Sequence, residues 1–520
     1  MNGTSATEWR VEGSGDQVAP HVGLALMASF ADRIGLGDCL STAVPWRGER
    51  AFAHDRGKVL VHAGLMLAGG GESCADIETL AAGSDRPLLE SVCSDTTLWR
   101  TLNQDLTPAV VDAVWAAVAD VRAKVWARSS ATTGTGPVVL DIDASLVEIH
   151  SENKEGSAPH FKRGFGFHPM FCFADATGEA LAAVLRPGNA AANNIADHET
   201  VLDAAIGQLP AGIAAGHRPG DDPALVRRAV RVRTDSAGCT RFVWSCRARN
   251  VGFSVVARTT AAIHAALLRL HVDDDAWEPL IDETTGEPRD DAFVADITGL
   301  VDLSDWPTGT HLVVRRERRH PGAQHSLFPS ELWRYWGHYT DQTGDPAALD
   351  ADIRAHAHVE QHIARLKDSG LCRMPFRSFD ANAAWLSLVC WAADLVRWFQ
   401  LLCLPGPLAR ATPKTLRWRI FHAPARAIRT GRRLVVRLLD DWPDTGALAR
   451  PPTRPSASSP EPRPPPAVGE PAPSHAPTQV SMAERPRRAF RGTLNRPGRH
   501  RQARPNRSPT TPSHLVNSGG

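Results

Sequence analysis

Apolar residues recur at helical spacing in the first part of the chain and at strand spacing further on. Up to about residue 135, the pattern predicts helices over 22–34, 58–67, 75–82 and 109–126. The polar run 94–97, just before an apolar stripe at 98–102, is typical of a helix start. We therefore expect residues 1–135 to form a helical N-terminal region.

From about residue 136 the period of the pattern changes. Strands are predicted over 136–150, 165–173, 180–186, 229–234 and 251–257, and helices over 194–209 and from about 240. A switch from hairpins to strand–helix alternation predicts a mixed α/β sheet. Residues 259–330 are less regular, with short strand-like runs at 293–297 and 311–314, and we interpret them as an insertion.

After the insertion the sheet is expected to resume at 332–339, before a long helix over 346–369. An apolar helix over 383–404 and a basic helical segment over 414–439 then predict a C-terminal helical region, 376–445. Residues 446–520 are rich in Pro, Ser and Arg, a composition that predicts a disordered tail. Its arginines suit either a solvated linker or weak, sequence-independent phosphate binding.

Two aspartates stand out in the first predicted strand. Asp141 and Asp143 are two residues apart, so on a strand both carboxylates emerge from the same face. Two acids on a packed face are costly unless a cation meets them, and a divalent metal ion is the usual partner. The alternative is that one of them only forms a turn at the strand's end.

A set of three acids is spread over three elements of the predicted sheet domain. Asp143 lies on the first strand, Asp235 at the carboxyl end of the fourth strand, and Glu360 on the long helix. If the first and fourth strands are neighbours and the helix crosses them, the carboxylates meet at one edge. They would then hold two Mg²⁺ ions about 3.5–4 Å apart, an arrangement suited to phosphodiester chemistry. Alternatively, Asp235 caps the next helix and Glu360 lies on a solvated face beside Arg365.

The composition limits which partners, metal sites and cellular locations are expected for the protein. Lys and Arg total 58 against 57 Asp and Glu, so the net charge of +1 does not indicate a polyanionic partner. Nine scattered cysteines without a C-x-x-C pair exclude a typical zinc site and favour a reduced cytoplasm. The N-terminus has no signal-peptide pattern. The apolar stretch 385–404 carries Asp394 and Arg397, which favours a buried helix over a membrane span.

Several sequence blocks together resemble the DDE group 1 insertion-sequence transposases. The blocks are VVLDIDASLVEIHSENKEG, HFKRGFGFHPMFCF, LRPGNAAANN, VRTDSAG and HVEQHIARLKDSGL, flanked by SDTTLWRTL and FDANAAWLSLVCWAADLVRWFQLLCL. The similarity runs from about residue 20 to 440. It implies an α/β, ribonuclease-H-like DDE catalytic domain over 136–375, with a β-rich insertion between the second Asp and the Glu.

The resemblance also assigns roles to residues. It implies that Asp143, Asp235 and Glu360 are the catalytic metal ligands, with Asp141 as a lesser candidate, and that Lys367 contacts DNA. Some relatives place a Tyr and an Arg ahead of the Glu, where this chain has Ile353 and His356. Arg354, from a neighbouring position, is a candidate to take over DNA binding there.

Further DNA contacts are hypotheses from the residues themselves. Lys154, Lys162 and Arg163 on the loop after the first strand are placed to hold phosphates near the metals. Trp333 and Trp336 either stack on a frayed base or pack in the core. The basic run 315–319 either grips DNA or forms a solvated edge. The N-terminal helices either bind DNA ends or serve as a packing scaffold.

The combined reading is a DNA transposase. We expect it to bind terminal inverted repeats, cleave a strand with Mg²⁺ (Mn²⁺ can replace it) and transfer the freed 3′ end into target DNA. The resemblance implies a homodimer assembled on double-stranded DNA in the cytoplasm, at the nucleoid when bound, and no membrane partner. Two alternatives stay open, a catalytically inactive DNA-binding remnant and a structure-selective nuclease on the same fold.

Overall fold

The structure is a computed structural model of the chain, and it describes part of the sequence. The described residues are 18–46, 54–81, 88–89, 91–151, 153–191, 194–235, 240–270, 274–282, 285–319, 333–430, 433–439 and 441–449.

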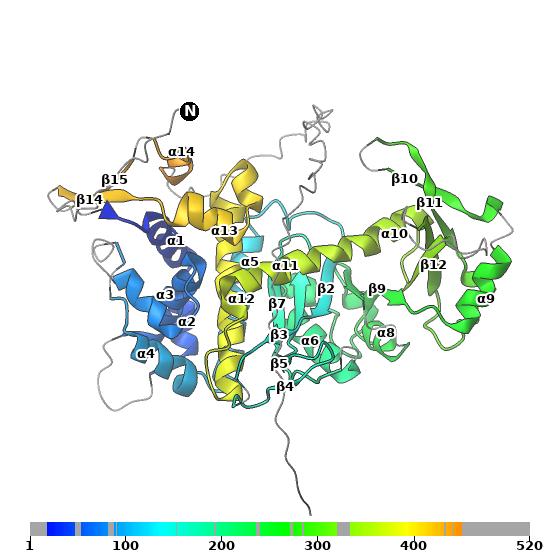
Figure 1. Cartoon of the computed structure of the whole chain (residues 1–520), viewed down its shortest axis with the longest axis horizontal. Helices are drawn as coiled ribbons and strands as arrows, with labels where there is room; N and C mark the ends of the chain where they lie inside the picture. Colours follow the sequence, from blue (N-terminus) through cyan, green and yellow to red (C-terminus); the bar gives the residue numbers. More distant parts are fainter. Residues whose placement is uncertain are drawn as a thin grey trace, which may run out of the picture. The chain divides into compact units, whose positions relative to one another are not determined.

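A nine-stranded mixed sheet forms the centre of the protein (Figure 1). In spatial order its strands are β10 (Glu278–Ile281), β11 (Pro288–Asp296), β12 (His311–Arg318), β13 (Trp333–Thr340), β9 (Val251–Ala257), β8 (Val230–Thr234), β2 (Val138–Ala144), β6 (Met170–Ala174) and β7 (Glu179–Val184). The strands β2, β8 and β9 are parallel, and all other neighbours are antiparallel. The ribonuclease-H-like mixed sheet, with its first strand beside its fourth, is therefore confirmed.

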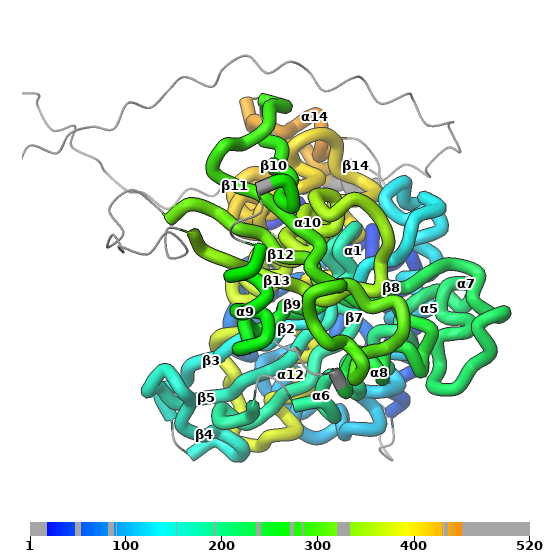
Figure 2. The backbone as a smooth tube through the Cα atoms, turned by 90° about the vertical axis from the view of Figure 1, so that its right-hand side faces the viewer, coloured from blue at the N-terminus to red at the C-terminus, as the bar shows by residue number. Residues whose placement is uncertain are grey.

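The predicted insertion extends this sheet instead of forming a separate body. Figure 2 shows β9, β13, β12 and β11 following one another outward from β2. The helix α9 (Ala261–Leu270) packs its apolar face, including Ile263 and Leu267, against the same core as the strands. The resumed strand β13 thus joins the insertion to the central sheet. Residues 320–332, part of the predicted insertion boundary, lie outside the described residues.

Helices cover both faces of the sheet. On one face, Leu140 and Ile142 of β2 share a core with the helices α6 (Ile195–Gly207) and α8 (Thr240–Arg247). The other face carries a nearly continuous helical segment made of α10 (Pro346–Arg354), a 3₁₀ turn (Ala355–Ala357), α11 (His358–Leu366) and a π turn (Lys367–Leu371). Because Asp141 and Asp143 alternate with Leu140 and Ile142, both acids face this second helical layer.

The N-terminal helices and the long C-terminal helix share one core. The helices are α1 (Val22–Arg33), α2 (Leu36–Ala43), α3 (Arg56–Gly69), α4 (Asp95–Arg100), α5 (Pro108–Trp126) and α12 (Phe379–Cys403), with a 3₁₀ helix at Cys74–Ala81 and a π turn at Thr101–Asp105. The start of α4 is as predicted, since the Ser94 hydroxyl accepts a hydrogen bond from the Thr97 amide. No disulfide joins the cysteines of the described residues.

The remaining elements are short. They comprise a small sheet of β3 (Val147–Glu148), β5 (Phe165–Phe167) and β4 (Ala158–Pro159), the helices α7 (Ala211–Ala214), α13 (Pro413–Leu416) and α14 (Thr445–Leu448), 3₁₀ turns at Pro223–Leu225, Asp274–Ala276, Thr298–Leu300 and Gly406–Arg410, and a π turn at Arg417–Phe421.

The predicted basic helix over 414–439 is wrong in its second half. Residues Ala425–Thr430 and Arg433–Leu438 form a hairpin, β14 and β15, and β14 also pairs with β1 (Val18–Ala19). The arginines of the run 425–430 lie three residues apart, at 426 and 429, so the run lacks the period of two that would have predicted a strand. Its pairing partner β1 lies about four hundred residues earlier, so no local pattern reveals it. The predicted tail beyond α14, from residue 450, lies outside the described residues.

The apolar helix α12 is long and apolar enough to cross a membrane, the one such helix among the described residues. It is mostly buried inside the protein, against α3, α5 and β7. Length and composition alone are therefore weak evidence for a span, since a core helix has the same features.

Asp394 of α12 belongs to a buried ionic network. The Arg122 guanidinium of α5 pairs with Glu179 of β7 at 3.0 Å and with Asp394 of α12 at 2.6 Å. The indole of Trp126 donates a further hydrogen bond to Glu179 at 2.6 Å. Two carboxylates share one guanidinium, and burial raises the pKa of Asp394 to about 7. The network ties the N-terminal helices, the sheet and α12 together.

Replacing Arg122 should therefore destabilise the whole fold. Arg122→Met leaves two buried carboxylates without their cation, so the free energy of unfolding should fall by about 3–5 kcal/mol. Chemical denaturation followed by tryptophan fluorescence measures the change. Lys124→Met, at an exposed position of the same helix, is the matched control and should stay within about 0.5 kcal/mol of the unmodified protein. Equal stability of the two variants would contradict this role.

Candidate active site

The three predicted catalytic acids come from three elements at one edge of the sheet. Asp143 lies near the end of β2, and Asp235 directly follows β8. The parallel register pairs Ile142 with Thr234, so the next step along both strands sets Asp235 beside Asp143. Glu360 lies in the first turn of α11, which contacts β2. Asp235 and Glu360 are exposed, whereas Asp143 is half-buried.

The negative charges of Asp235 and Glu360 both act on the Asp143 carboxyl. Burial, the negative charge of Asp235 and, to a smaller extent, that of Glu360 raise the pKa of Asp143 to about 6. A hydrogen bond that its Oδ1 accepts from the Ala144 amide, at 2.7 Å, acts in the opposite direction. The three carboxylates therefore share one repulsive electrostatic field, and a bound cation would relieve that repulsion.

The three carboxylates lie at the same edge of the sheet, but their oxygens do not converge on a common metal position. Among the described residues, no three Asp, Glu, His or Cys side chains lie close enough to hold a common ion. The chemistry of the donors still fits Mg²⁺, a hard cation that prefers oxygen ligands and binds through a few carboxylates plus waters and phosphates. Because Asp235 and Glu360 are exposed, their side chains have room to turn toward an ion.

Asp141, the lesser metal candidate, is fully buried and its oxygens are occupied. Arg233 donates to both of them, Nε to Oδ1 and Nη2 to Oδ2, each at 2.8 Å. The Nδ1 atom of His356 lies 2.8 Å from Oδ1. Burial alone would raise the pKa of Asp141, but the hydrogen bonds from His356 and Arg233 lower it below its ordinary value. Asp141 is therefore an ionised anchor for these two side chains.

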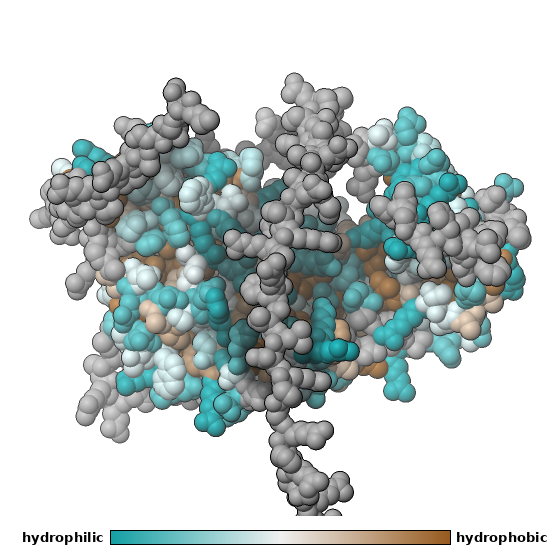
Figure 3. All heavy atoms as spheres, viewed as in Figure 1, coloured by the Kyte–Doolittle hydropathy of each residue, from teal (hydrophilic) through white to brown (hydrophobic). Residues whose placement is uncertain are grey.

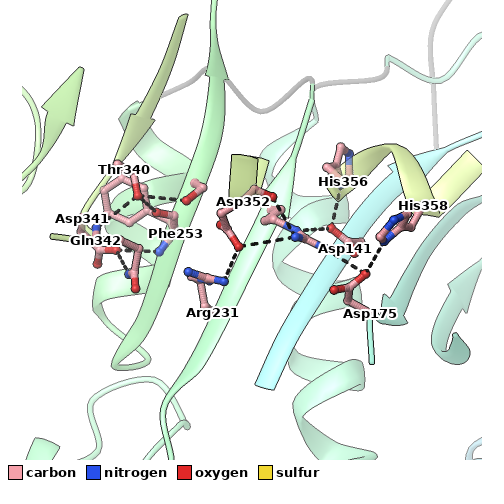
Figure 4. A network of polar contacts seen from close by, with 12 residues as sticks. Asp141, Asp175, Arg231, Phe253, Thr340, Asp341, Gln342, Asp352, His356 and His358 are labelled. Atoms are coloured by element: carbon pink, nitrogen blue, oxygen red, sulfur yellow. Dashed lines mark hydrogen bonds and ion pairs between the residues drawn. The ribbon is translucent and has the colours of Figure 1, made fainter. Parts of the chain in front are cut away.

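Arg233 connects the sheet to the helical segment through hydrogen bonds to Asp141 and Asp352, two residues that Figure 4 labels. Besides Asp141, its guanidinium reaches Asp175 at 3.1 Å and donates to the main-chain oxygen of Asp352 at 2.8 Å. The neighbouring Arg231 pairs with the Asp352 carboxylate at 2.5 Å. His358 contacts Asp175 at 3.0 Å. Together these pairs fasten the helical segment that carries Glu360 onto the strands that carry the two aspartates.

A basic groove adjoins the acids. Ser145 and Leu146, which follow β2 directly, form part of its wall, and four cationic side chains line it: Lys154, Lys162, Lys367 and Arg373. The loop that carries Lys154 is fixed in place, since the Lys154 ammonium donates to the Met374 carbonyl and the Glu155 amide donates to the Arg377 carbonyl at 2.9 Å. The structure thus brings three of the predicted DNA-binding lysines to one surface.

Two other predicted DNA contacts do not line this groove. Arg163 is exposed on the same loop, at a positive φ of 65°. Arg354 lies on α10 and pairs with Asp350 one turn earlier at 3.0 Å. Ile353, beside it, is buried in the core.

The aromatic residues of β13 divide between two environments. Trp333 packs against the Arg316 guanidinium, which also lies over the rings of Trp277 and Phe293. Trp336, on the opposite face of the strand, is 41% exposed and lies beneath Arg315. Hydrophilic residues gather around β10 and β11 at the outer end of the insertion (Figure 3).

The sequence patterns did not single out several residues of this site. Arg233 lies within a strand, where the sequence pattern predicts a solvent-exposed arginine. Arg373 comes two residues after the π turn Lys367–Leu371. Phe161 gives no such signal in the sequence either, although it is 75% exposed with Lys162 over its ring. The signal for Arg233 was its spacing, since it precedes Asp235 by two residues and therefore shares its strand face, as Asp141 does with Asp143.

Comparison with known proteins identifies the family. The model of the transposase DDE domain, group 1, matches residues 2–454. The chain belongs to this family and is a DNA transposase of the DDE type. No curated protein matches the sequence. Among solved structures, a piggyBac transposase in a synaptic complex with hairpin DNA is similar at a TM-score of 0.36 and 8% identity, covering 78% of this chain and 80% of that chain.

The repulsion among the acids predicts a pH-dependent stability. The pKa of Asp143 rises from 3.8 to about 6 on folding, so the folded protein binds this proton more tightly than the unfolded chain. Stability should therefore fall as the pH rises from about 4 to 6, and remain lower above. Without divalent ions, Asp143→Asn should melt above the unmodified protein near neutral pH, and the difference should vanish below about pH 4.

Thermal unfolding at several pH values measures this effect. Asp112→Asn, at an exposed position on α5, is the control and should follow the unmodified protein throughout. A variant at Asp143 that melts below the unmodified protein near neutral pH would contradict the repulsion.

Proposed function

We propose that this transposase binds the terminal inverted repeats of an insertion sequence, cleaves a DNA strand at each end and joins the freed 3′ end to target DNA. The observation that supports the proposal is the paired register of β2 and β8, whose ends carry Asp143 and Asp235, together with the contact of α11, which carries Glu360, with β2. Membership in the DDE family supports their role as the catalytic set.

These three carboxylates are the proposed ligands of Mg²⁺, two ions in all, with Mn²⁺ as a substitute. Bound there, Mg²⁺ supplies activation of the attacking hydroxyl and stabilisation of the leaving oxygen. The carboxylates contribute hard oxygen ligands and leave positions for water and phosphate. The Asp141–Arg233 pair contributes by holding the strands and the helix in fixed relation, which keeps the ligands within reach of one another.

The basic groove is the proposed path of the DNA backbone next to the acids. Lys154, Lys162, Lys367 and Arg373 would neutralise phosphates, and the exposed ring of Phe161 offers a stacking surface for an unpaired base. Trp336 and Arg315 on the insertion, with Arg163 and Arg354, are secondary candidates for contacts further along the DNA. We further propose a homodimer that holds two DNA ends together in the cytoplasm, since joining requires both ends.

Single substitutions of the acids test the catalytic proposal. Asp143→Asn, Asp235→Asn and Glu360→Gln should each reduce Mg²⁺-dependent cleavage of the element's own ends to background, because each removes a charged oxygen ligand. Binding of those ends, measured by gel shift, should stay largely intact. Asp112→Asn is again the matched control and should cleave normally. A variant that cuts like the control would remove that residue from the catalytic set.

Pre-cut ends separate transposition from the alternatives. A transposase should join a pre-cut 3′ end to target DNA, and mapped junctions would show it. Cleavage without joining would indicate a structure-selective nuclease, and end binding without cleavage an inactive remnant. Either result would refute the proposed function.

The salt dependence of binding tests the groove. Lys162→Ala and Lys367→Ala should each weaken end binding and lower the slope of log affinity against log salt by about one unit, since each would remove one phosphate contact. Lys124→Ala, on an exposed face of α5, should leave both values unchanged. Unchanged slopes in both groove variants would place the DNA elsewhere.

A further inference from the structure

One ring nitrogen beside the acidic site has no partner. The Nδ1 atom of His356 lies 2.8 Å from Asp141, whereas Nε2 is buried without any hydrogen-bond partner. A buried polar atom without a partner costs about 1–3 kcal/mol, so such an atom in a site is evidence for a missing ligand.

The tautomer of His356 follows from Asp141. Because both Asp141 oxygens accept hydrogen bonds from Arg233, this carboxylate is an acceptor, and the imidazole donates its Nδ1–H to it. With Nδ1 as the donor, Nε2 is the ring nitrogen that can offer a lone pair to a metal ion. This carboxylate–histidine arrangement is the one that commonly orients a histidine for binding a metal.

The ring is also close to the catalytic acids. The ring lies 2.8 Å from Asp141, and Asp143 follows Asp141 by two residues on β2, so the ring lies over the strand face that carries Asp143. His356 precedes Glu360 by four residues, one turn earlier on the same face of the helical segment. His356 therefore contacts the anchor Asp141 and lies one helical turn before Glu360, a proposed metal ligand.

Two other histidines of the same helical segment lack this combination. His362 is half-buried, with both ring nitrogens buried and unpartnered, but it contacts Phe173 and lines an apolar cavity with Arg365 and Arg397, a poor place for a cation. His358 is exposed and contacts Asp175.

We propose that His356 Nε2 is a ligand of the divalent ion held by Asp143 and Glu360, and that Asp141 is the carboxylate that orients it. The inference rests on the proposed function of the three acids and adds a nitrogen to their oxygen ligands. Imidazole suits Mn²⁺ better than Mg²⁺, so His356 should contribute more to Mn²⁺ affinity.

Pulsed electron paramagnetic resonance of bound Mn²⁺ tests the proposal without relying on activity. The full chain with Mn²⁺ should show modulation from a directly bound ¹⁴N, and ¹⁵N-histidine labelling should shift that modulation to ¹⁵N. His356→Gln should remove it and weaken Mn²⁺ binding about 10–100-fold, with a smaller loss for Mg²⁺. His264→Gln, at an exposed position on α9, should keep both the modulation and the affinity.

The possible outcomes are distinguishable. Mn²⁺ that binds to the unmodified protein but not to Asp143→Asn, without nitrogen modulation, would overturn the role of His356 and leave the proposed function intact. Mn²⁺ that binds equally to the unmodified protein and to Asp143→Asn would instead refute the proposed function. If His356→Gln does not fold, labelled unmodified protein and labelled Asp143→Asn still decide, since the latter must lose any histidine coupling.

Discussion

The buried pair of Asp141 and Arg233 is the interaction on which the arrangement of this protein depends. Each member lies two residues before a proposed catalytic aspartate and on the same strand face. The third partner, His356, lies one helical turn before Glu360. Each proposed catalytic acid is therefore preceded by a residue of this hydrogen-bonded network. The spacing is two residues along the strands and four residues along the helical segment.

Joining a helix to a sheet through buried charges costs free energy. A buried ion pair often contributes less to stability than apolar residues of the same volume, because both charges lose their hydration. An apolar contact, however, would tolerate sliding of the helix, whereas a bidentate guanidinium–carboxylate pair fixes distance and direction. We infer that the function of this network is to fix the positions of Asp143, Asp235 and Glu360. These acids repel one another and would otherwise move apart.

The sequence predicted those features whose cause is local. Alternation of apolar residues located β8 and β9, and the same-face spacing of Asp141 and Asp143 drew attention to β2. Features that depend on distant partners were not predicted. Arg122 finds its carboxylates 57 and 272 residues away, and β14 pairs with a strand near the N-terminus. The lone Arg233 gave no sign of its partner, because a strand pattern does not reveal which strand lies beside it.

The most direct test of the central claim is anomalous diffraction from crystals of the protein with its DNA ends and Mn²⁺. The account predicts anomalous peaks at the edge of the sheet, with oxygens of Asp143, Asp235 and Glu360 at about 2.1 Å from an ion. Asp141 should remain paired with Arg233 and contribute no oxygen. Anomalous peaks elsewhere on the protein would contradict the account. So would a structure in which any of the three acids binds neither ion.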